Sequence, residues 1–192
     1  EGYSFAIVPD GEDWMVVSGV ANTESLSSWC MAKLAEVLPA GTYRRAGGEP
    51  GPALFGWVSG QYRFDRYLSK PSEEGPRILL TQDVAAIEPV LTEAAAVALV
   101  RDLVNTPAED MGPAQLEHEA QLIAKAHRAE FKVTSGDALE RGFPMVHGVG
   151  RAAARSHAPR MIELHWGDEK HPKIALVGKG VCFDSGGLDI KP

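Results

Sequence analysis

Cysteine is scarce in this sequence. The 192 residues include two cysteines, Cys30 and Cys182, which lie far apart and in no spacing typical of a metal site. A small secreted domain that depended on disulfides would contain more of them. We therefore expect both to be buried free thiols in a reducing compartment, and we predict a cytoplasmic protein.

Long apolar runs and an excess of basic charge are missing as well. No stretch approaches the roughly 18 uninterrupted apolar residues that a membrane span needs. The first residues show no basic leader followed by an apolar stretch. Asp and Glu number 26 against 19 Lys and Arg, which gives a net charge of -7. We therefore expect neither a membrane nor a nucleic acid among the partners, since a nucleic-acid surface needs clustered basic residues.

The one local basic cluster in the sequence is small. It consists of Arg151, Arg155 and Arg160 together with His157. A nucleic-acid footprint would need a larger group on one face of the protein. We expect this cluster in a solvated loop or in a subunit contact.

The composition is that of an ordinary soluble globular protein, with 44% hydrophobic and 23% charged residues. A chain of this length can form one good core or two small ones. Residues 69–76 are rich in charges and turn formers, so they make the best domain boundary. We predict a small N-terminal α/β domain at 1–68 and a second domain at 69–192.

Local patterns predict the elements of the first domain. Short apolar runs and turn residues favour strands at 5–8 and 14–17. Apolar residues at three- and four-residue steps favour a helix at 25–38. The Gly- and Pro-rich residues 41–52 are expected to form a loop. The aromatic side chains within 53–67 are expected to pack in the core.

The second domain alternates strands with helices. Residues 92–105 have one apolar helical face, and Pro113 can occupy the first position of the next helix. Strands are predicted at 77–81, 131–134, 161–166 and 174–177. This alternation predicts an α/β fold in which a sheet is covered on both faces.

The most informative segment runs from Gly178 to Lys191, directly after the apolar run 174–177. It contains Lys179, Asp184, a Gly-Gly pair and the second lysine. In an α/β sheet, residues at the carboxyl end of a strand face the crevice where ligands bind. Lysines and a carboxylate are costly to desolvate there unless they take part in chemistry or pair with each other.

Four kinds of site can be considered for this segment. A phosphate-binding P-loop needs a glycine and a Ser or Thr at positions where this sequence has Lys173 and Gly180. A serine nucleophile at Ser185 is suggested by the Asp-Ser-Gly-Gly order of the trypsin family, but that family is built from β-barrels. The other two are a buried ion pair between Lys179 and Asp184, and a metal site. Asp184 is a hard oxygen ligand suited to Zn²⁺, Mn²⁺ or Mg²⁺, and a lysine can ligate a metal only through its neutral amine.

The segment resembles the metal-site signature of the leucyl aminopeptidase family, the cytosolic two-metal exopeptidases. Lys179, Asp184 and Lys191 have its spacings of five and twelve positions, and Gly186-Gly187 falls where the family has a Gly-Gly pair. Upstream segments are also similar to the family, namely Arg101 to Pro107 with Pro113 and Leu116, Gly148 to Arg151, and Pro159 to Ile162.

This resemblance implies a metal-dependent aminopeptidase that releases leucine-like N-terminal residues from peptides. Residues 69–192 would be the first part of its catalytic domain, with a mixed sheet flanked by helices. Asp184 would bridge two divalent ions, Mn²⁺ or Zn²⁺, and Lys179 would bind the tighter one. Lys191 would bind the substrate carbonyl and stabilise the oxyanion without ligating a metal. The metal pair would hold the free α-amine of the peptide and activate water.

The family's other carboxylate ligands, and the arginine that holds its bicarbonate base, follow the signature and fall outside this sequence. Three ligand-type residues cannot hold two divalent cations, so we expect this chain alone to be inactive. The resemblance also implies a homohexamer. The alternative is a non-catalytic module that binds a ligand or mediates assembly and keeps a vestigial metal signature.

Overall fold

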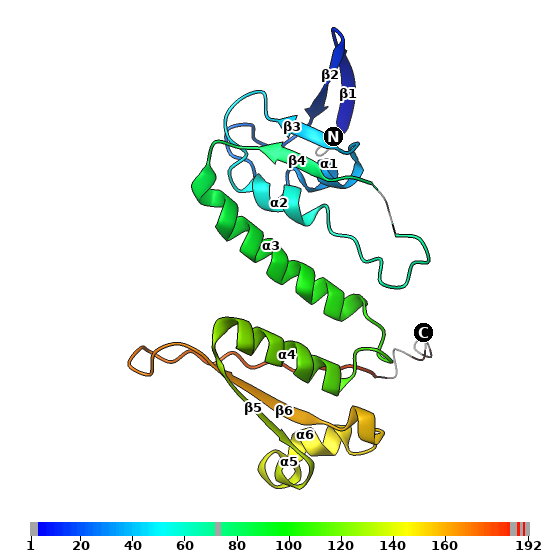
Figure 1. Cartoon of the computed structure of the whole chain (residues 1–192), viewed down its shortest axis with the longest axis vertical. Coiled ribbons are helices and arrows are strands. Elements are labelled where there is room, and N and C mark those ends of the chain that lie inside the picture. The colour runs from blue at the N-terminus through cyan, green and yellow to red at the C-terminus, as the bar shows by residue number, and fades with distance from the viewer. Residues whose placement is uncertain (1–3, 72–73, 185–187, 189, 191–192) are drawn as a thin grey trace. The chain divides into compact units, whose positions relative to one another are not determined.

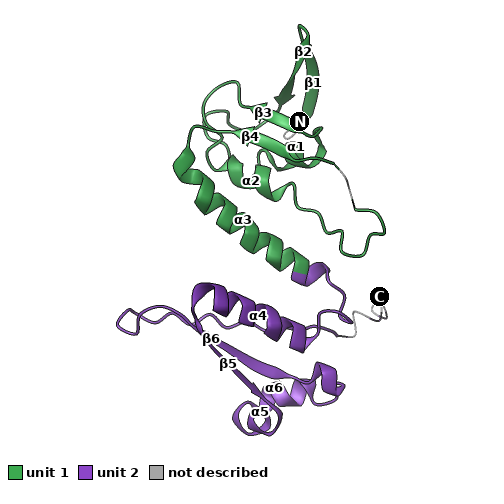
Figure 2. Ribbon diagram, viewed as in Figure 1, with its two compact units in different colours: residues 1–102 green, residues 103–192 purple. Residues whose placement is uncertain are grey.

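The computed structural model describes residues 4–71, 74–184, 188 and 190, and the chain forms two compact units. One unit comprises Glu1–Asp102 and the other Leu103–Pro192 (Figure 2). Both units combine helices with short strands (Figure 1), so the predicted α/β class is confirmed. The division into domains at 1–68 and 69–192 stays a prediction.

The first unit begins with an antiparallel hairpin. β1 (Phe5–Asp10) pairs with β2 (Asp13–Ser18) over the whole length of both strands. The turn between them contains Gly11 at a φ of 66°, a conformation that glycine adopts without strain. Both strands confirm the prediction made from the apolar runs and the turn residues between them.

A second small sheet joins segments that are distant in the sequence. β3 (Gly41–Arg44) lies parallel to β4 (Arg77–Leu80). The strand predicted at 77–81 is confirmed, whereas the loop predicted at 41–52 was wrong for its first residues. β3 exists through its pairing with β4, and the local composition of a segment does not reveal such a distant partner.

The first helix is shorter than predicted. α1 (Ala32–Val37) occupies only the end of the segment 25–38. Before it, the backbone N–H of Ser27 donates to Cys30 Sγ, and the Ser27 hydroxyl also contacts this sulfur atom, both at 3.2 Å. Local side-chain interactions of serine compete with helical hydrogen bonds, which accounts for the late start of α1.

The core of the first unit forms where α2 (Ala53–Ser59) packs against α1. The ring of Tyr43 contacts the ring of Trp57 edge-on, with centroids 5.4 Å apart. Within the aromatic stretch 53–67, the helical Trp57 is 2% exposed and Tyr67 is 50% exposed. The predicted aromatic core is therefore confirmed for α2 and wrong for the end of the stretch. The central buried cluster consists of Leu34, Ala35, Leu38 and Trp57.

α3 (Val84–Asn105) follows β4 and contains the helix predicted at 92–105. It starts earlier than predicted, where the Asp83 carboxylate accepts a hydrogen bond of 3.3 Å from a backbone N–H of the first turn. Near its other end, Tyr62 Oη donates to Asp102 Oδ1 at 2.6 Å. This bond joins the segment after α2 to α3 within the first unit.

The second unit is built around an antiparallel strand pair. The strands predicted at 131–134 and 161–166 are confirmed, and so is the helix that begins at Pro113. Two short helices between the strands were not predicted. The elements are α4 (Pro113–His127), β5 (Glu130–Ser135), α5 (Gly136–Gly142), α6 (Pro144–Gly150), the 3₁₀ helix η1 (Arg155–His157) and β6 (Arg160–His165). α4 and α5 contact both strands of the pair, and α6 contacts β6 (Figure 1).

The strand predicted at 174–177 is not formed. Ile174, Leu176 and Val177 are 87%, 94% and 91% exposed. A strand is held by hydrogen bonds to a neighbouring strand, and residues 174–177 pair with no strand in the described part of the chain. An apolar run alone therefore did not make this segment a strand.

Two further expectations concern the cysteines and the membrane. Cys30 and Cys182 are both free thiols, as predicted. Cys30 is buried, as expected, whereas Cys182 is only half-buried. None of the helices in the described residues has both the length and the apolar character needed to cross a bilayer.

Candidate metal-binding segment

Two of the three predicted site residues lie on one segment that follows β6. Lys179 and Asp184 belong to residues 174–184, which form neither helix nor strand, and both residues are exposed. The third residue, Lys191, lies outside the described residues. The expected position at the carboxyl end of a strand is not observed, because residues 174–177 are not a strand.

The donor atoms of this segment fit part of a site for a divalent cation. A carboxylate oxygen and a neutral amine nitrogen suit Zn²⁺ or Mn²⁺. The described residues contain no group of three or more His, Cys, Asp and Glu that could hold a metal ion. A catalytic zinc ion takes about three protein ligands. Lys179 and Asp184 can therefore supply only part of a coordination shell.

The segment is anchored on the first turns of α4. A Cβ atom at Gly180 would lie 3.0 Å from Leu116 Cδ2, so the backbone passes directly over this side chain. Real side chains rarely come so close, because protein interiors are packed at van der Waals distances. Glycine therefore allows the backbone between Lys179 and Asp184 to pack against α4.

An ion pair lies beside this contact. Arg160, at the start of β6, pairs through Nη1 with Glu117 of α4, and the two side chains are only 15% and 30% exposed. Arg160 Nε and Nη2 donate to the carbonyl oxygen of Ala158 at 3.3 and 3.2 Å. All three guanidinium nitrogens are thus bonded. The expectation of a solvated loop was wrong for Arg160, which lies in β6 and pairs inside its own unit, and the alternative of a subunit contact stays a prediction.

Cys182 is close to the same ion pair. Burial raises the pKa of the Cys182 thiol, and the nearby Arg160 guanidinium partly opposes this effect. Its neighbours Val181 and Phe183 are 50% and 56% exposed. Reactive cysteines have a lowered pKa, so Cys182 has the character of a packing residue rather than of a nucleophile.

The loop before β6 closes on the start of α4. The His157 ring occupies the space that a Cβ atom at Gly112 would need, and the Gly112 N–H donates to Gln115 Oε1 at 3.1 Å. At the other end of this loop, a Cβ atom at Gly150 would lie 2.6 Å from Pro159 Cγ. His157 therefore packs against the start of α4, and Pro159, at the end of the loop, packs against Gly150 of α6.

Glu117 was not among the predicted site residues. It directly follows Leu116, which belongs to the resembling segments, but its partner Arg160 lies 43 residues further along the chain. Spacing along a sequence does not reveal an ion pair between such distant residues. The pairing became visible only in the folded chain.

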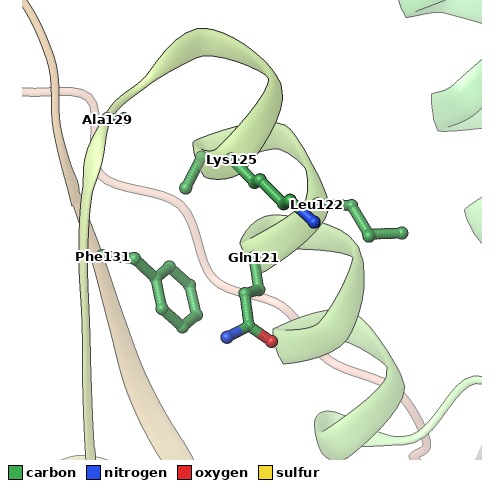
Figure 3. Close-up of a pocket in the computed structure, with 6 residues that line it drawn as sticks. Gln121, Leu122, Lys125, Ala129 and Phe131 are labelled. Carbon is green, nitrogen blue, oxygen red and sulfur yellow. The ribbon is translucent and has the colours of Figure 1, made fainter.

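A separate hollow of about 470 Å³ lies between α4 and β5 (Figure 3). None of the three predicted site residues is among those that line it, so it is not the site expected from the signature. The walls are apolar at Leu122, Ala124, Ala129 and Phe131, and polar groups are provided by Gln121 and Lys125.

Two sequence models of known domains match this chain. The model of the cytosol aminopeptidase family, catalytic domain, matches residues 98–192, and the model of the M17 aminopeptidase N-terminal domain matches residues 1–80. The chain belongs to the cytosol aminopeptidase family. The resemblance to leucyl aminopeptidases is thereby confirmed.

Individual relatives and solved structures are similar to most of this chain. The "probable cytosol aminopeptidase" of Brucella melitensis biotype 1 is 32% identical over 194 aligned positions, covering 94% of this chain and 39% of that protein. The crystal structure of cytosol aminopeptidase from Coxiella burnetii matches with a TM-score of 0.84 and 38% identity, covering 100% of this chain and 42% of that one. The bottromycin maturation enzyme BotP in complex with Mn matches with a TM-score of 0.69 and 25% identity, covering 88% and 40%.

The chain thus spans less than half the length of the relatives it matches. The match to the cytosol aminopeptidase catalytic domain begins inside α3 and includes Lys179 and Asp184. The match to the N-terminal domain ends with β4. All the contacts described around α4 therefore lie within the region that corresponds to the catalytic domain of the family.

Proposed function

We propose that this chain is the amino-terminal part of a metal-dependent aminopeptidase that releases leucine-like N-terminal residues from peptides. One observation carries the proposal. Lys179 and Asp184 lie on one segment, anchored to α4, inside the region that matches the catalytic domain of the family. The names of the relatives, which are cytosol aminopeptidases, support the same class of reaction.

Two residues of the chain would hold metal. Asp184 would bridge two divalent ions through its carboxylate, and Lys179 would bind the tighter ion through its neutral amine. Bound divalent ions supply Lewis-acid chemistry, which polarises a carbonyl group and lowers the pKa of water. Further ligands would come from outside the described residues, since these contain no group of three or more ligand-type side chains.

Lys191 would act on the substrate rather than on the metal. Its ammonium group would donate a hydrogen bond to the carbonyl oxygen of the scissile peptide. Negative charge develops on this oxygen during the reaction, and a donor fixed in advance stabilises that charge more than it stabilises the ground state. Lys191 would therefore be both a substrate-binding and a catalytic residue.

Mn²⁺ and Zn²⁺ are the ions that we propose. The related enzyme BotP has been solved in complex with Mn, which supports a divalent metal as the cofactor. Oxygen and nitrogen donors accept either ion, so the donor set of Lys179 and Asp184 is compatible with both. Bicarbonate is the further cofactor that we propose, because the resemblance to the leucyl aminopeptidase family implies it.

The partners would be peptides with a free N-terminus and further copies of the chain in a homohexamer. Lys179 and Asp184 would hold ions that can take a free α-amine as a ligand, and such a site would favour cleavage of the first peptide bond. We propose a cytoplasmic location, in agreement with the name of the relatives.

The second possibility is a non-catalytic module that binds a ligand or mediates assembly. The incomplete ligand set among the described residues is the observation in its favour. Acidic metal ligands after Pro192 in the complete polypeptide would support the enzyme, and their loss would support the module.

The decisive experiment uses the complete polypeptide that contains this chain. The purified protein is stripped of metal with a chelator, and Mn²⁺ or Zn²⁺ is then added back. We expect metal-dependent hydrolysis of leucine amide and no hydrolysis of the same substrate with an acetylated amine. Hydrolysis that does not depend on metal, or none with either ion, would contradict the proposal.

A further inference from the structure

Several residues of the segments that resemble the family have no part in the chemistry proposed above. Leu116 lies in α4, Arg160 begins β6, and Gly180 lies between the two proposed metal ligands. The fold brings all three to the first turns of α4, together with Glu117. None of these residues has a role in the proposed chemistry, so any role of this cluster at the metal site would be indirect.

The contact between Leu116 and Gly180 fixes the backbone one residue after Lys179. A Cβ atom at position 180 would lie 3.0 Å from Leu116 Cδ2, so a larger residue would require the end of the Leu116 side chain to move. A loop held in this way loses little further conformational freedom when its side chains bind an ion.

The ion pair fixes the start of β6 on the same part of α4. Nη1 of Arg160 is bonded to Glu117, and Nε and Nη2 are bonded to the carbonyl oxygen of Ala158. A planar guanidinium bonded at all three nitrogens has one orientation. Glu117 directly follows Leu116 on α4, so the ion pair lies beside the contact with Gly180.

We propose that Leu116, Glu117 and Arg160 are positioning residues that hold Lys179 and Asp184 at the spacing needed to bind a metal ion. The proposal rests on the function proposed above, because it concerns the same segment. Groups that orient metal ligands typically change metal affinity by about 10- to 100-fold when they are removed. The first turns of α4 would act on the metal only through the segment that they hold.

The first measurement follows the packing directly and needs no metal. Alkylation of Cys182 by iodoacetamide is followed by peptide mass spectrometry in the metal-free complete polypeptide. Leu116→Ala should raise the alkylation rate several-fold, because it removes the side chain beneath the segment. Cys30 is 6% exposed in the first unit and should react at an unchanged rate. An unchanged rate at Cys182, or an equal rise at both cysteines, would overturn the proposal.

The second measurement follows metal affinity in a variant that keeps the shape of the side chain. Glu117→Gln should lower the affinity for Mn²⁺ by about 10-fold or more in calorimetric titration. At saturating Mn²⁺, kcat should return close to its original value, because the variant loses affinity rather than a catalytic group. Equal Mn²⁺ affinity in Glu117→Gln and the unchanged protein would overturn the proposal.

A matched control comes from the same unit. Glu163 pairs with Lys132 at 3.1 Å across β5 and β6. Glu163→Gln should leave Mn²⁺ affinity unchanged, and a loss as large as that of Glu117→Gln would overturn the specific role of the α4 ion pair. If the unchanged protein binds no metal, the proposed function fails, whereas the alkylation rates still decide whether α4 holds the segment.

Discussion

Arg77 Nε donates a hydrogen bond to the carbonyl oxygen of Leu38 at 2.6 Å. Arg77 is only 8% exposed, and its own carbonyl oxygen accepts hydrogen bonds from the side chains of Trp57 and Gln61, both at 2.9 Å. One residue at the start of β4 thus connects the end of α1 with α2 and the segment that follows it. Arg77 Nη2 also donates to Glu74 Oε2 at 2.6 Å, and a buried guanidinium group needs such acceptors.

Arg77→Met should destabilise the first unit. Methionine keeps much of the apolar volume but removes the donors to the Leu38 carbonyl group and to the exposed Glu74 carboxylate. The exposed pair contributes little, and the loss of the buried hydrogen bond to Leu38 costs about 1–3 kcal/mol. We expect the free energy of unfolding in urea to fall by about 2 kcal/mol. The control is Lys33→Met, because the Lys33 side chain is 55% exposed and its pair with Glu36 contributes little. Equal effects of the two substitutions would contradict this role of Arg77.

Gly60→Ala should also weaken the first unit. A Cβ atom at Gly60 would overlap the carbonyl oxygen of Ala32, so α1 and α2 would have to separate. Overpacking of this kind costs about 1–3 kcal/mol. Gly148→Ala is the control, because nothing lies within 4 Å of a Cβ added there in α6. It should stabilise the chain by about 0.5–1 kcal/mol, since alanine favours a helix. The two glycines should therefore change the urea midpoint in opposite directions.

The sequence predicted elements whose signals are local. Turn residues between two apolar runs predicted the β1–β2 hairpin, and Pro113 marked the start of α4. β3 was missed because its stability comes from β4, and the segment 174–177 was predicted as a strand because apolar runs do not show whether a partner strand is present. Pairing between distant segments was thus the main source of error.

The same reason limited the prediction of the site. Lys179 and Asp184 were predicted from their spacing in a known signature, and the family to which that signature belongs is confirmed. Their individual roles stay predictions. Glu117 could not be predicted, because its ion pair with Arg160 depends on how α4 and β6 pack.

Asp184→Ala in the complete polypeptide should abolish peptidase activity and reduce the amount of bound metal. Alanine has no oxygen atom that could replace the proposed bridging carboxylate as a metal ligand. Lys179→Ala should weaken mainly the tighter site. Glu169→Ala removes an exposed carboxylate from the turn after β6 and should change neither quantity. Elemental analysis after dialysis gives the metal content, and full occupancy of both sites in Asp184→Ala would show that the bridging role is wrong.

Lys191→Ala separates a catalytic residue from a metal ligand. Both metal ions should remain bound, while kcat falls by about 10²- to 10³-fold, the usual effect of losing one donor to a developing oxyanion. Loss of metal together with activity would make Lys191 a ligand instead. Ser185→Ala should retain substantial activity, whereas an inactive but folded Ser185→Ala protein would favour the serine nucleophile.

The 192-residue chain alone should have no aminopeptidase activity, even with added Mn²⁺ or Zn²⁺. A catalytic zinc ion takes about three protein ligands, so two ions need more than the two ligands that we propose in this chain. The described residues offer no group of three or more ligand-type side chains that could replace them. The experiment compares hydrolysis of a leucine amide or anilide by this chain and by the complete polypeptide at equal concentration, with and without a chelator. If the purified 192-residue chain hydrolyses the substrate and the chelator abolishes this activity, the chain must contain enough metal ligands for catalysis. Residues other than Lys179 and Asp184 would then have to supply the remaining ligands.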